Sequence, residues 1–136
     1  MPLAYPRVLV VDDFREVADL LTEVLAMHGI VAQAAYGGAE AIQLAQAFQP
    51  DALLLDLGML NIDGFDVAAA MRRTDFDPYL VALSAWDDPA IRARTRAAGF
   101  HAHLGKPSSI DEIVATIRGI DMTGRRRAPA AGSFTQ

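Results

Sequence analysis

Cysteine is absent from the 136 residues of this sequence. Disulfide bonds, thiolate metal sites and thiol catalysis are therefore excluded, and the composition suits a reducing compartment. There is also no apolar run close to the ~20 residues that a membrane-spanning helix requires. The N-terminal stretch MPLAYPRVLVVDD reaches its first carboxylates too early for a signal peptide. We therefore expect a cytoplasmic protein that does not contact a membrane.

Basic residues are outnumbered by acidic ones, which gives a formal net charge of -5 and a pI near 5.0. A nucleic-acid-binding domain normally shows a clustered basic excess, so no nucleic-acid partner is expected. Hydrophobic residues make up 52% of the chain, enough to form one core in a single domain of this size. Residues 121–136 carry three arginines with glycine, proline and alanine but no apolar periodicity. They are predicted to be a disordered tail or a linker remnant.

Short apolar runs alternate with helical patterns along the chain. Strands are predicted at 7–11, 30–35, 51–56, 79–84 and 100–104. Helices are predicted from Phe14 to the stop at Gly29, at 39–48, at 65–71, from the Asp88-Pro89 start to Gly99, and from a Ser109/Glu112 capping box onward. Strands that alternate with helices in this way predict a doubly wound α/β fold with a parallel sheet.

The leucine-rich strand ALLLD ends abruptly in a carboxylate, Asp56. A polar residue at a strand end is common, so Asp56 alone could be a boundary residue or a site residue. In doubly wound sheets, however, ligands bind outside the carboxyl ends of the strands. Five polar residues follow strand ends on this predicted rim: Asp12, Asp13, Asp56, Ser84 and Lys106.

Each rim residue also has a purely structural interpretation. Asp13 with Glu16 matches a capping box for the first helix, Ser84 could simply end a strand, and Lys106 could be a solvated amine. These interpretations do not explain why all five fall on one rim. Three clustered carboxylates repel one another unless they share protons or bind a hard cation such as Mg²⁺. A lysine and a serine nearby supply the charge and the donor that a phosphoryl group needs, and an aspartate can act as its nucleophile.

With these motifs the chain resembles the receiver domain of bacterial response regulators, the phospho-accepting module of two-component signalling. The resemblance covers residues 5–120 and is carried by VLVVDD (8–13), LLLDLGMLNIDG (53–64), ALSAW (82–86) and HLGKP (103–107), whose order and separations fit the family. It implies a flavodoxin-like (βα)5 fold with a five-stranded parallel sheet in strand order 2-1-3-4-5.

The resemblance also implies roles for individual residues. Asp56 would accept the phosphoryl group, Ser84 would hydrogen-bond it and move with it, and Lys106 would pair with it. Mg²⁺ would be held by Asp12, Asp13, Asp56 and the backbone carbonyl of Gly58. The Lys106-Pro107 peptide bond would be cis.

A partner histidine kinase or histidine phosphotransfer protein would supply the phosphoryl group. The output would be a protein contact on the face formed by the fourth helix, fifth strand and fifth helix. Such a protein is a signalling switch more than an enzyme, although it assists its own phosphorylation and dephosphorylation. The short N-terminus and the lack of an output domain favour a stand-alone regulator, but the tail after Asp121 could be the start of a linker.

The sequence departs from the family pattern at several positions. Leu60 stands where proline is usual. Gly58 and Trp86 flank the site without the polar side chains of fast-hydrolysing members. His103 occupies the position where many members have a tyrosine or phenylalanine that swings inward on activation. A switch role is implied for Ser84 and for the position of His103, but the rotating-aromatic mechanism cannot be assumed for a histidine.

Three other classes of protein share parts of this pattern. A degenerate receiver would keep the fold without accepting phosphate, which the intact acidic rim argues against. A haloacid-dehalogenase-type phosphatase would need an aspartate two residues after Asp56, where Gly58 stands. A flavin-binding domain would need a phosphate-cradling loop after the first strand, where the acidic pair lies.

Overall fold

The computed structural model describes residues 6–59, 62–73, 77–85, 88–106 and 108–120. Within them, five strands and five helices alternate along the chain. The strands are β1 (Arg7–Val11), β2 (Val31–Ala35), β3 (Ala52–Asp56), β4 (Tyr79–Ser84) and β5 (Ala102–Gly105). The helices are α1 (Arg15–Met27), α2 (Gly38–Phe48), α3 (Gly64–Met71), α4 (Pro89–Ala97) and α5 (Ile110–Arg118).

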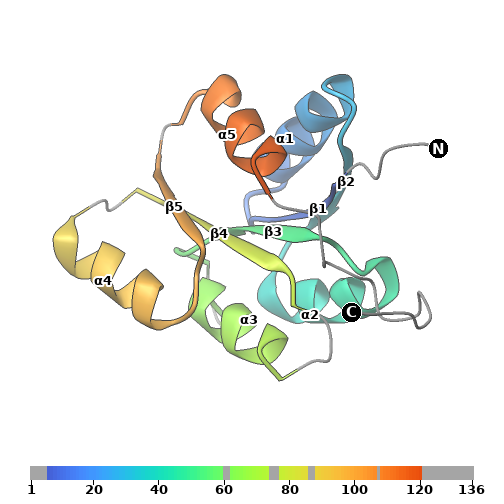
Figure 1. The fold of residues 1–136 in the computed structure, drawn as a ribbon. Helices are drawn as coiled ribbons and strands as arrows, with labels where there is room; N and C mark the ends of the chain where they lie inside the picture. The colour runs from blue at the N-terminus through green and yellow to red at the C-terminus, as the bar shows by residue number, and fades with distance from the viewer. Residues whose placement is uncertain (1–5, 60–61, 74–76, 86–87, 107, 121–136) are drawn as a thin grey trace.

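The strands form one parallel sheet in the order β2-β1-β3-β4-β5, as predicted. Helices α1 and α5 cover one face of the sheet, and α2, α3 and α4 cover the other (Figure 1). The doubly wound, flavodoxin-like fold is therefore confirmed. No helix in the described part of the chain is long and apolar enough to cross a lipid bilayer.

Alternation along the strands divides the core into two layers. Leu53 and Leu55 of β3 belong to the cluster under α2 and α3, whereas Leu54 belongs to the cluster under α1 and α5. All five residues of β3 are buried, because a central strand of a parallel sheet is covered on both faces. The run of leucines that precedes Asp56 thus has a structural cause, and it fixes Asp56 at the end of the central strand.

We expect Leu54→Ala to lower the free energy of unfolding by about 3 kcal/mol, since Leu54 is 1% exposed and its truncation leaves a cavity between the sheet and two helices. Chemical denaturation of both proteins measures this loss. The matched control is Leu20→Ala on α1, where the side chain is 60% exposed and the change should be within about 0.5 kcal/mol. Equal losses for the two variants would contradict this description of the core.

The predicted helix starts are partly confirmed. The side chain of Asp88 caps α4 by accepting from the N–H of Ile91 at 2.9 Å, and Pro89 occupies the first turn. Ser109 caps α5 by accepting from the N–H of Glu112 at 3.1 Å. The capping-box alternative for Asp13 is wrong, because α1 begins after Phe14 and has no side-chain cap. Asp13 instead lies in a cluster with Asp12 and Asp56.

The fifth strand begins two residues later than predicted, at Ala102. Phe100 is instead part of the turn that closes α4: its N–H donates to the carbonyl of Thr95 at 3.0 Å, and Gly99 before it has φ +94°. Its ring packs edge-on against Phe65 of α3, with ring centroids 5.8 Å apart. Residues Leu60, Trp86, Pro107 and 121–136 lie outside the described residues, so the interpretations that concern them stay predictions.

Candidate functional site

The acidic rim forms at the carboxyl ends of β1 and β3, which are neighbours in the sheet. Their register pairs Val10 with Leu54 and Val11 with Leu55. The next residues along the two strands are Asp12 and Asp56, so the sheet itself brings the two carboxylates side by side. The N–H of Asp12 also donates to the carbonyl of Ala35 in β2 at 3.1 Å, which holds the rim in line with the sheet.

Three carboxylates meet at this rim. One oxygen from each of Asp12, Asp13 and Asp56 lies within 4.8 Å of the others. Asp12 and Asp56 are buried, at 2% and 9% exposure, and Asp13 is exposed. A donor set made of oxygen atoms and open to solvent on one side suits a hard divalent cation that keeps part of its water shell. The three carboxylates among the four predicted metal ligands are therefore brought together, and their chemistry fits the cation.

Lys106 follows β5 and reaches back across β4 to the acidic rim. Its Nζ lies 3.2 Å from Oδ1 of Asp56 and 3.4 Å from Oδ2 of Asp12. Its backbone N–H donates to the carbonyl of Ser84 at 2.8 Å, which positions the start of the side chain. The lysine side chain is 32% exposed, so the ion pairs are partly screened by water. Lys106 nevertheless offsets part of the repulsion between the two buried carboxylates.

Burial, the largest effect, raises the pKa of Asp12. The backbone N–H of Phe14, which donates to Oδ1 of Asp12 at 3.0 Å, acts in the opposite direction. The charge of Asp56 raises this pKa further, and Lys106 lowers it. A raised pKa means that the metal-free site accommodates the Asp12 carboxylate less well than water does. A bound cation would remove that penalty.

Ser84 ends β4 and is 3% exposed. It pairs with Gly105 of β5, while its neighbour Leu83 pairs with Asp56 of β3. The carbonyl of Leu83 also accepts from the N–H of Leu57 at 3.0 Å. Ser84 therefore lies on the same rim as the carboxylates, one strand away from Asp56.

Two glycines shape the loop after Asp56. The N–H of Gly58 donates to Oδ1 of Asp56 at 3.1 Å, so the loop folds back over the carboxylate. A Cβ at Gly64, the first residue of α3, would lie 3.0 Å from the backbone carbonyl oxygen of Asp56. A side chain at this position would therefore push the start of α3 away from the end of β3. Gly64 was not among the predicted site residues, although it ends the motif LLLDLGMLNIDG at a fixed distance after Asp56.

His103 was the one predicted switch residue away from the rim. It lies on β5 and its Nδ1 is 3.0 Å from the hydroxyl oxygen of Thr95 on α4. Thr95 is 2% exposed and was not predicted as a functional residue. The structure thus places His103 at the contact between β5 and α4, which the apolar and polar pattern of the sequence did not reveal.

A family model described as the response regulator receiver domain matches residues 8–118 of this chain. The chain is also similar to the response regulator MprA of Mycobacterium ulcerans (strain Agy99), with 35% identity over 114 residues, 84% of this chain and 49% of the relative. MprA of Mycobacterium tuberculosis (strain ATCC 25618 / H37Rv) is 35% identical over 114 residues, 84% of this chain and 50% of that relative. The chain spans about half the length of the curated relatives it matches.

Solved structures show the same fold. The receiver domain of Francisella response regulator 1452 superposes with a TM-score of 0.78 at 28% identity, covering 83% of this chain and 93% of that chain. The chemotaxis protein CheY4 of Vibrio cholerae gives a TM-score of 0.79 at 24% identity, covering 85% of this chain and 98% of that chain. The second similarity concerns the fold alone.

Proposed function

This chain belongs to the response regulator receiver domain family, the phospho-accepting modules of two-component signalling, and on that basis we propose that Asp56 is its phospho-acceptor. The observation that carries the proposal is the position of Asp56, which ends the central strand, joins two other carboxylates and lies 3.2 Å from the Lys106 ammonium. The phosphoryl donor would be a phosphohistidine of a histidine kinase or a histidine phosphotransfer protein.

The contacts of Asp56 indicate which of its oxygens reacts. Oδ1 accepts from the N–H of Gly58 and faces Nζ of Lys106. Among the described residues, Oδ2 has no such donor, which leaves its electron pair available. We propose that Oδ2 attacks phosphorus while the bond from phosphorus to the donor nitrogen breaks. The product is an acyl phosphate whose carbonyl oxygen, Oδ1, keeps its hydrogen bond to Gly58.

Mg²⁺ is the cation that we propose for the acidic cluster, held by Asp12, Asp13, Asp56 and the backbone carbonyl of Gly58. When bound, it would neutralise charge on the carboxylates and on the phosphoryl oxygens. Lys106 would contribute a second positive charge from the β5 side, and the Ser84 hydroxyl would donate to a phosphoryl oxygen. These residues would assist phosphorylation and dephosphorylation of the protein itself, so that it acts as a signalling switch rather than as an enzyme with its own substrate. The compartment that we propose for it is the cytoplasm.

Uptake of a phosphoryl group from acetyl phosphate tests this proposal. We expect intact-mass spectrometry to detect one added phosphoryl group on the wild type in the presence of Mg²⁺. EDTA should prevent the addition, and Asp56→Asn should abolish it because an amide is not a nucleophile at this position. Equal labelling of wild type and Asp56→Asn would refute the assignment. No labelling of the wild type in Mg²⁺ would instead favour a degenerate receiver that acts only through protein contacts.

The output surface that we propose is the face formed by α4, β5 and α5. The hydrogen bond between Thr95 and His103 joins two of these elements, and β5 continues directly into Lys106 at the site. Movement of Lys106 or Ser84 toward a phosphoryl group would therefore displace β5 and change its contact with α4. A switch role for His103 in this coupling remains part of the proposal.

We expect beryllofluoride, a phosphoryl mimic, to shift the backbone amide resonances of α4 and β5 as well as those of the acidic rim. Two-dimensional NMR of the labelled protein with Mg²⁺ measures these shifts. Asp56→Asn is the control and should show none of them, since the mimic needs the carboxylate. Shifts confined to the loops around Asp12 and Asp56 would contradict a β5-mediated output.

A further inference from the structure

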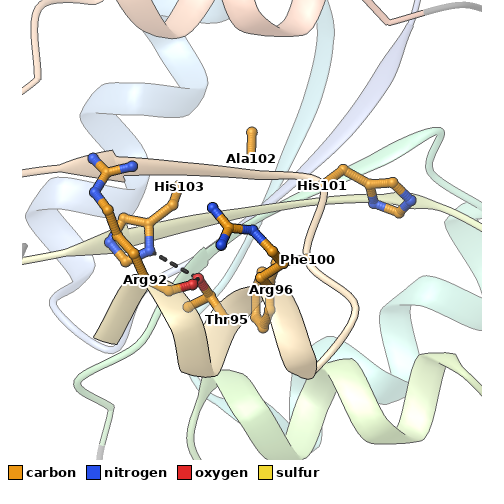
Figure 2. A pocket seen from close by; sticks show the side chains of 7 residues that line it. All are labelled: Arg92, Thr95, Arg96, Phe100, His101, Ala102 and His103. Carbon is orange, nitrogen blue, oxygen red and sulfur yellow. Dashed lines mark hydrogen bonds between the residues drawn. The ribbon is translucent and has the colours of Figure 1, made fainter. Parts of the chain in front are cut away.

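A cavity of about 250 Å³ lies between α4 and β5, away from the acidic rim (Figure 2). Its lining combines positive side chains, imidazoles and two apolar residues, and none of the lining residues is acidic. They are Arg92, Thr95, Arg96, Phe100, His101, Ala102 and His103. None of the predicted rim residues lines it, and His103, which lies away from the rim, is the predicted site residue that does.

The spacing of the α4 residues explains why two of its three arginines line the cavity. Arg92, Thr95 and Arg96 are three and four residues apart, so they share one face of the helix. Arg94 lies on another face, where its guanidinium carbon is 3.9 Å from the centre of the Phe65 ring. Two arginines of α4 thus line the cavity, whereas the third, Arg94, contacts α3.

The floor of the cavity is fixed by hydrogen bonds. The buried Thr95 hydroxyl lies 2.9 Å from the carbonyl oxygen of Arg92 and 3.0 Å from Nδ1 of His103, and Figure 2 shows the latter contact. The N–H of Phe100 donates to the carbonyl of Thr95. The cavity is therefore built by the connection of α4 to β5, so that its shape does not depend on long surface side chains alone.

The charge of this region contrasts with that of the rest of the chain. Helix α4 contains three arginines and no acidic residue, in a protein whose formal net charge is -5. Arg92 and Arg96 are four residues apart, and like charges at this spacing repel each other. Within the described residues Arg96 makes no ion pair with a carboxylate. An anion bound beside the Arg96 guanidinium would gain a charged donor and would reduce the repulsion between the two positive side chains.

We propose that this cavity binds a carboxylate side chain from an acidic segment of a partner protein. Phe100 and Ala102 give the cavity an apolar wall, which suits a carboxylate carried on a short aliphatic stem next to an apolar residue better than a free phosphate ion. Two arginines in an acidic protein are too few for a nucleic acid, whose backbone would be repelled elsewhere. The acidic partner would thus bind on the proposed output surface. The role of this contact in signalling rests on the proposed function, whereas binding of a carboxylate in the cavity does not.

A terminally blocked tetrapeptide, Leu-Glu-Glu-Leu, tests the proposal with Leu-Gln-Gln-Leu as its uncharged counterpart. We expect the acidic peptide to shift amide resonances of residues 92–103 saturably, and the glutamine peptide to bind at least tenfold more weakly. The double variant Arg92→Gln/Arg96→Gln should weaken the acidic peptide at least tenfold. Arg94→Gln, which removes the same charge from the same helix outside the cavity, should change its affinity less than twofold.

Arg94→Gln also shows whether the peptide binds in the cavity or is attracted by any positive charge at the end of α4. Arg94 and Arg96 both lie in the last turn of α4, where positive side chains complement the helix dipole. If the acidic peptide responded equally to loss of Arg94 and of Arg96, or bound the double variant as well as the wild type, the cavity assignment would be overturned. Stronger binding of a single-stranded oligonucleotide, or of inorganic phosphate, at residues 92–103 would overturn the choice of a protein carboxylate.

The peptide titration is independent of phosphorylation at the acidic rim. We expect Asp56→Asn, which removes the proposed acceptor, to bind the acidic peptide as the unphosphorylated wild type does. If Asp56→Asn binds the peptide and the wild type takes up no phosphoryl group, the proposal for the cavity is supported and the assignment of Asp56 as phospho-acceptor is rejected. Phosphoryl uptake by a wild type that does not bind the peptide would reject the cavity alone.

Discussion

Mg²⁺ is expected to raise the melting temperature of this protein, and Asp12→Asn is expected to remove most of that rise. A ligand that binds only the folded state stabilises it by about 2.7 kcal/mol at a concentration 100 times its Kd, which corresponds to a shift of roughly ten degrees for a domain of this size. Asp12 contributes one of the three clustered carboxylates and is buried beside Asp56. Scanning calorimetry with Mg²⁺ or EDTA measures the effect.

The pH dependence of the metal-free protein provides a second readout for Asp12. Burial, the main cause, raises the pKa of Asp12 in the folded state above the value of the unfolded chain. The folded state therefore binds the proton more tightly, and its stability falls as the pH rises from the unfolded value of about 4 through the raised pKa. Asp12→Asn cannot titrate and should lack this loss, so that the metal-free variant at neutral pH is at least as stable as the wild type.

Asp111→Asn is the matched control for Asp12→Asn, because Asp111 is exposed in the first turn of α5 and lies outside the acidic cluster. It removes the same charge and should keep the full response to Mg²⁺. Loss of the response in both variants would mean that Mg²⁺ acts through net charge, and an undiminished response in Asp12→Asn would place the cation elsewhere.

Lys106→Met is expected to slow phosphoryl uptake from acetyl phosphate by about 100-fold, the usual cost of removing one charged group that stabilises a transition state. Nζ of Lys106 lies within 3.4 Å of both buried carboxylates, where it can follow the phosphoryl group as it reaches Asp56. The same substitution should tighten Mg²⁺ binding, because it removes a positive charge that competes for the same oxygens. Stopped-flow uptake and a Mg²⁺ titration separate the two effects.

Lys106→Arg is the control for charge at this position. It keeps the positive charge with a different geometry, so its uptake rate should lie between those of the wild type and Lys106→Met. If Lys106→Met weakened Mg²⁺ binding and uptake in parallel, the lysine would act by holding the acidic rim together. Its proposed contact with the phosphoryl group would then be contradicted.

Much of the fold followed from the sequence, because a parallel sheet imposes strong patterns on its strands. β3 is buried on both faces, so its run of leucines was visible, and the carboxylate at its end marked the rim. The bounds of β1 and β4 were predicted to the residue. The acidic cluster could be predicted because the carboxyl ends of parallel strands lie along one edge of the sheet. Predicting which carboxylates lie near Asp56 therefore did not require knowledge of side-chain directions.

Features that depend on side-chain direction could not be predicted in this way. Whether Asp13 capped α1 or joined the carboxylate cluster depended on where the helix begins, and Phe14 takes the cap position. The contact of Thr95 with His103 depends on the close approach of α4 to β5, which no local pattern encodes. The cavity beside it arises from the same packing. Its arginines and their helical spacing were visible in the sequence, but which face of α4 lines a cavity beside β5 was not.

The most direct test of the central claim is to locate the phosphoryl group after acetyl phosphate treatment in Mg²⁺. Borohydride reduces an aspartyl phosphate to homoserine and leaves free carboxylates unchanged, so tandem mass spectrometry of a proteolytic digest identifies the acceptor. The proposal predicts homoserine at position 56 and aspartate at positions 12 and 13. Homoserine at position 12 or 13, or a labelled protein with intact Asp56, would contradict it.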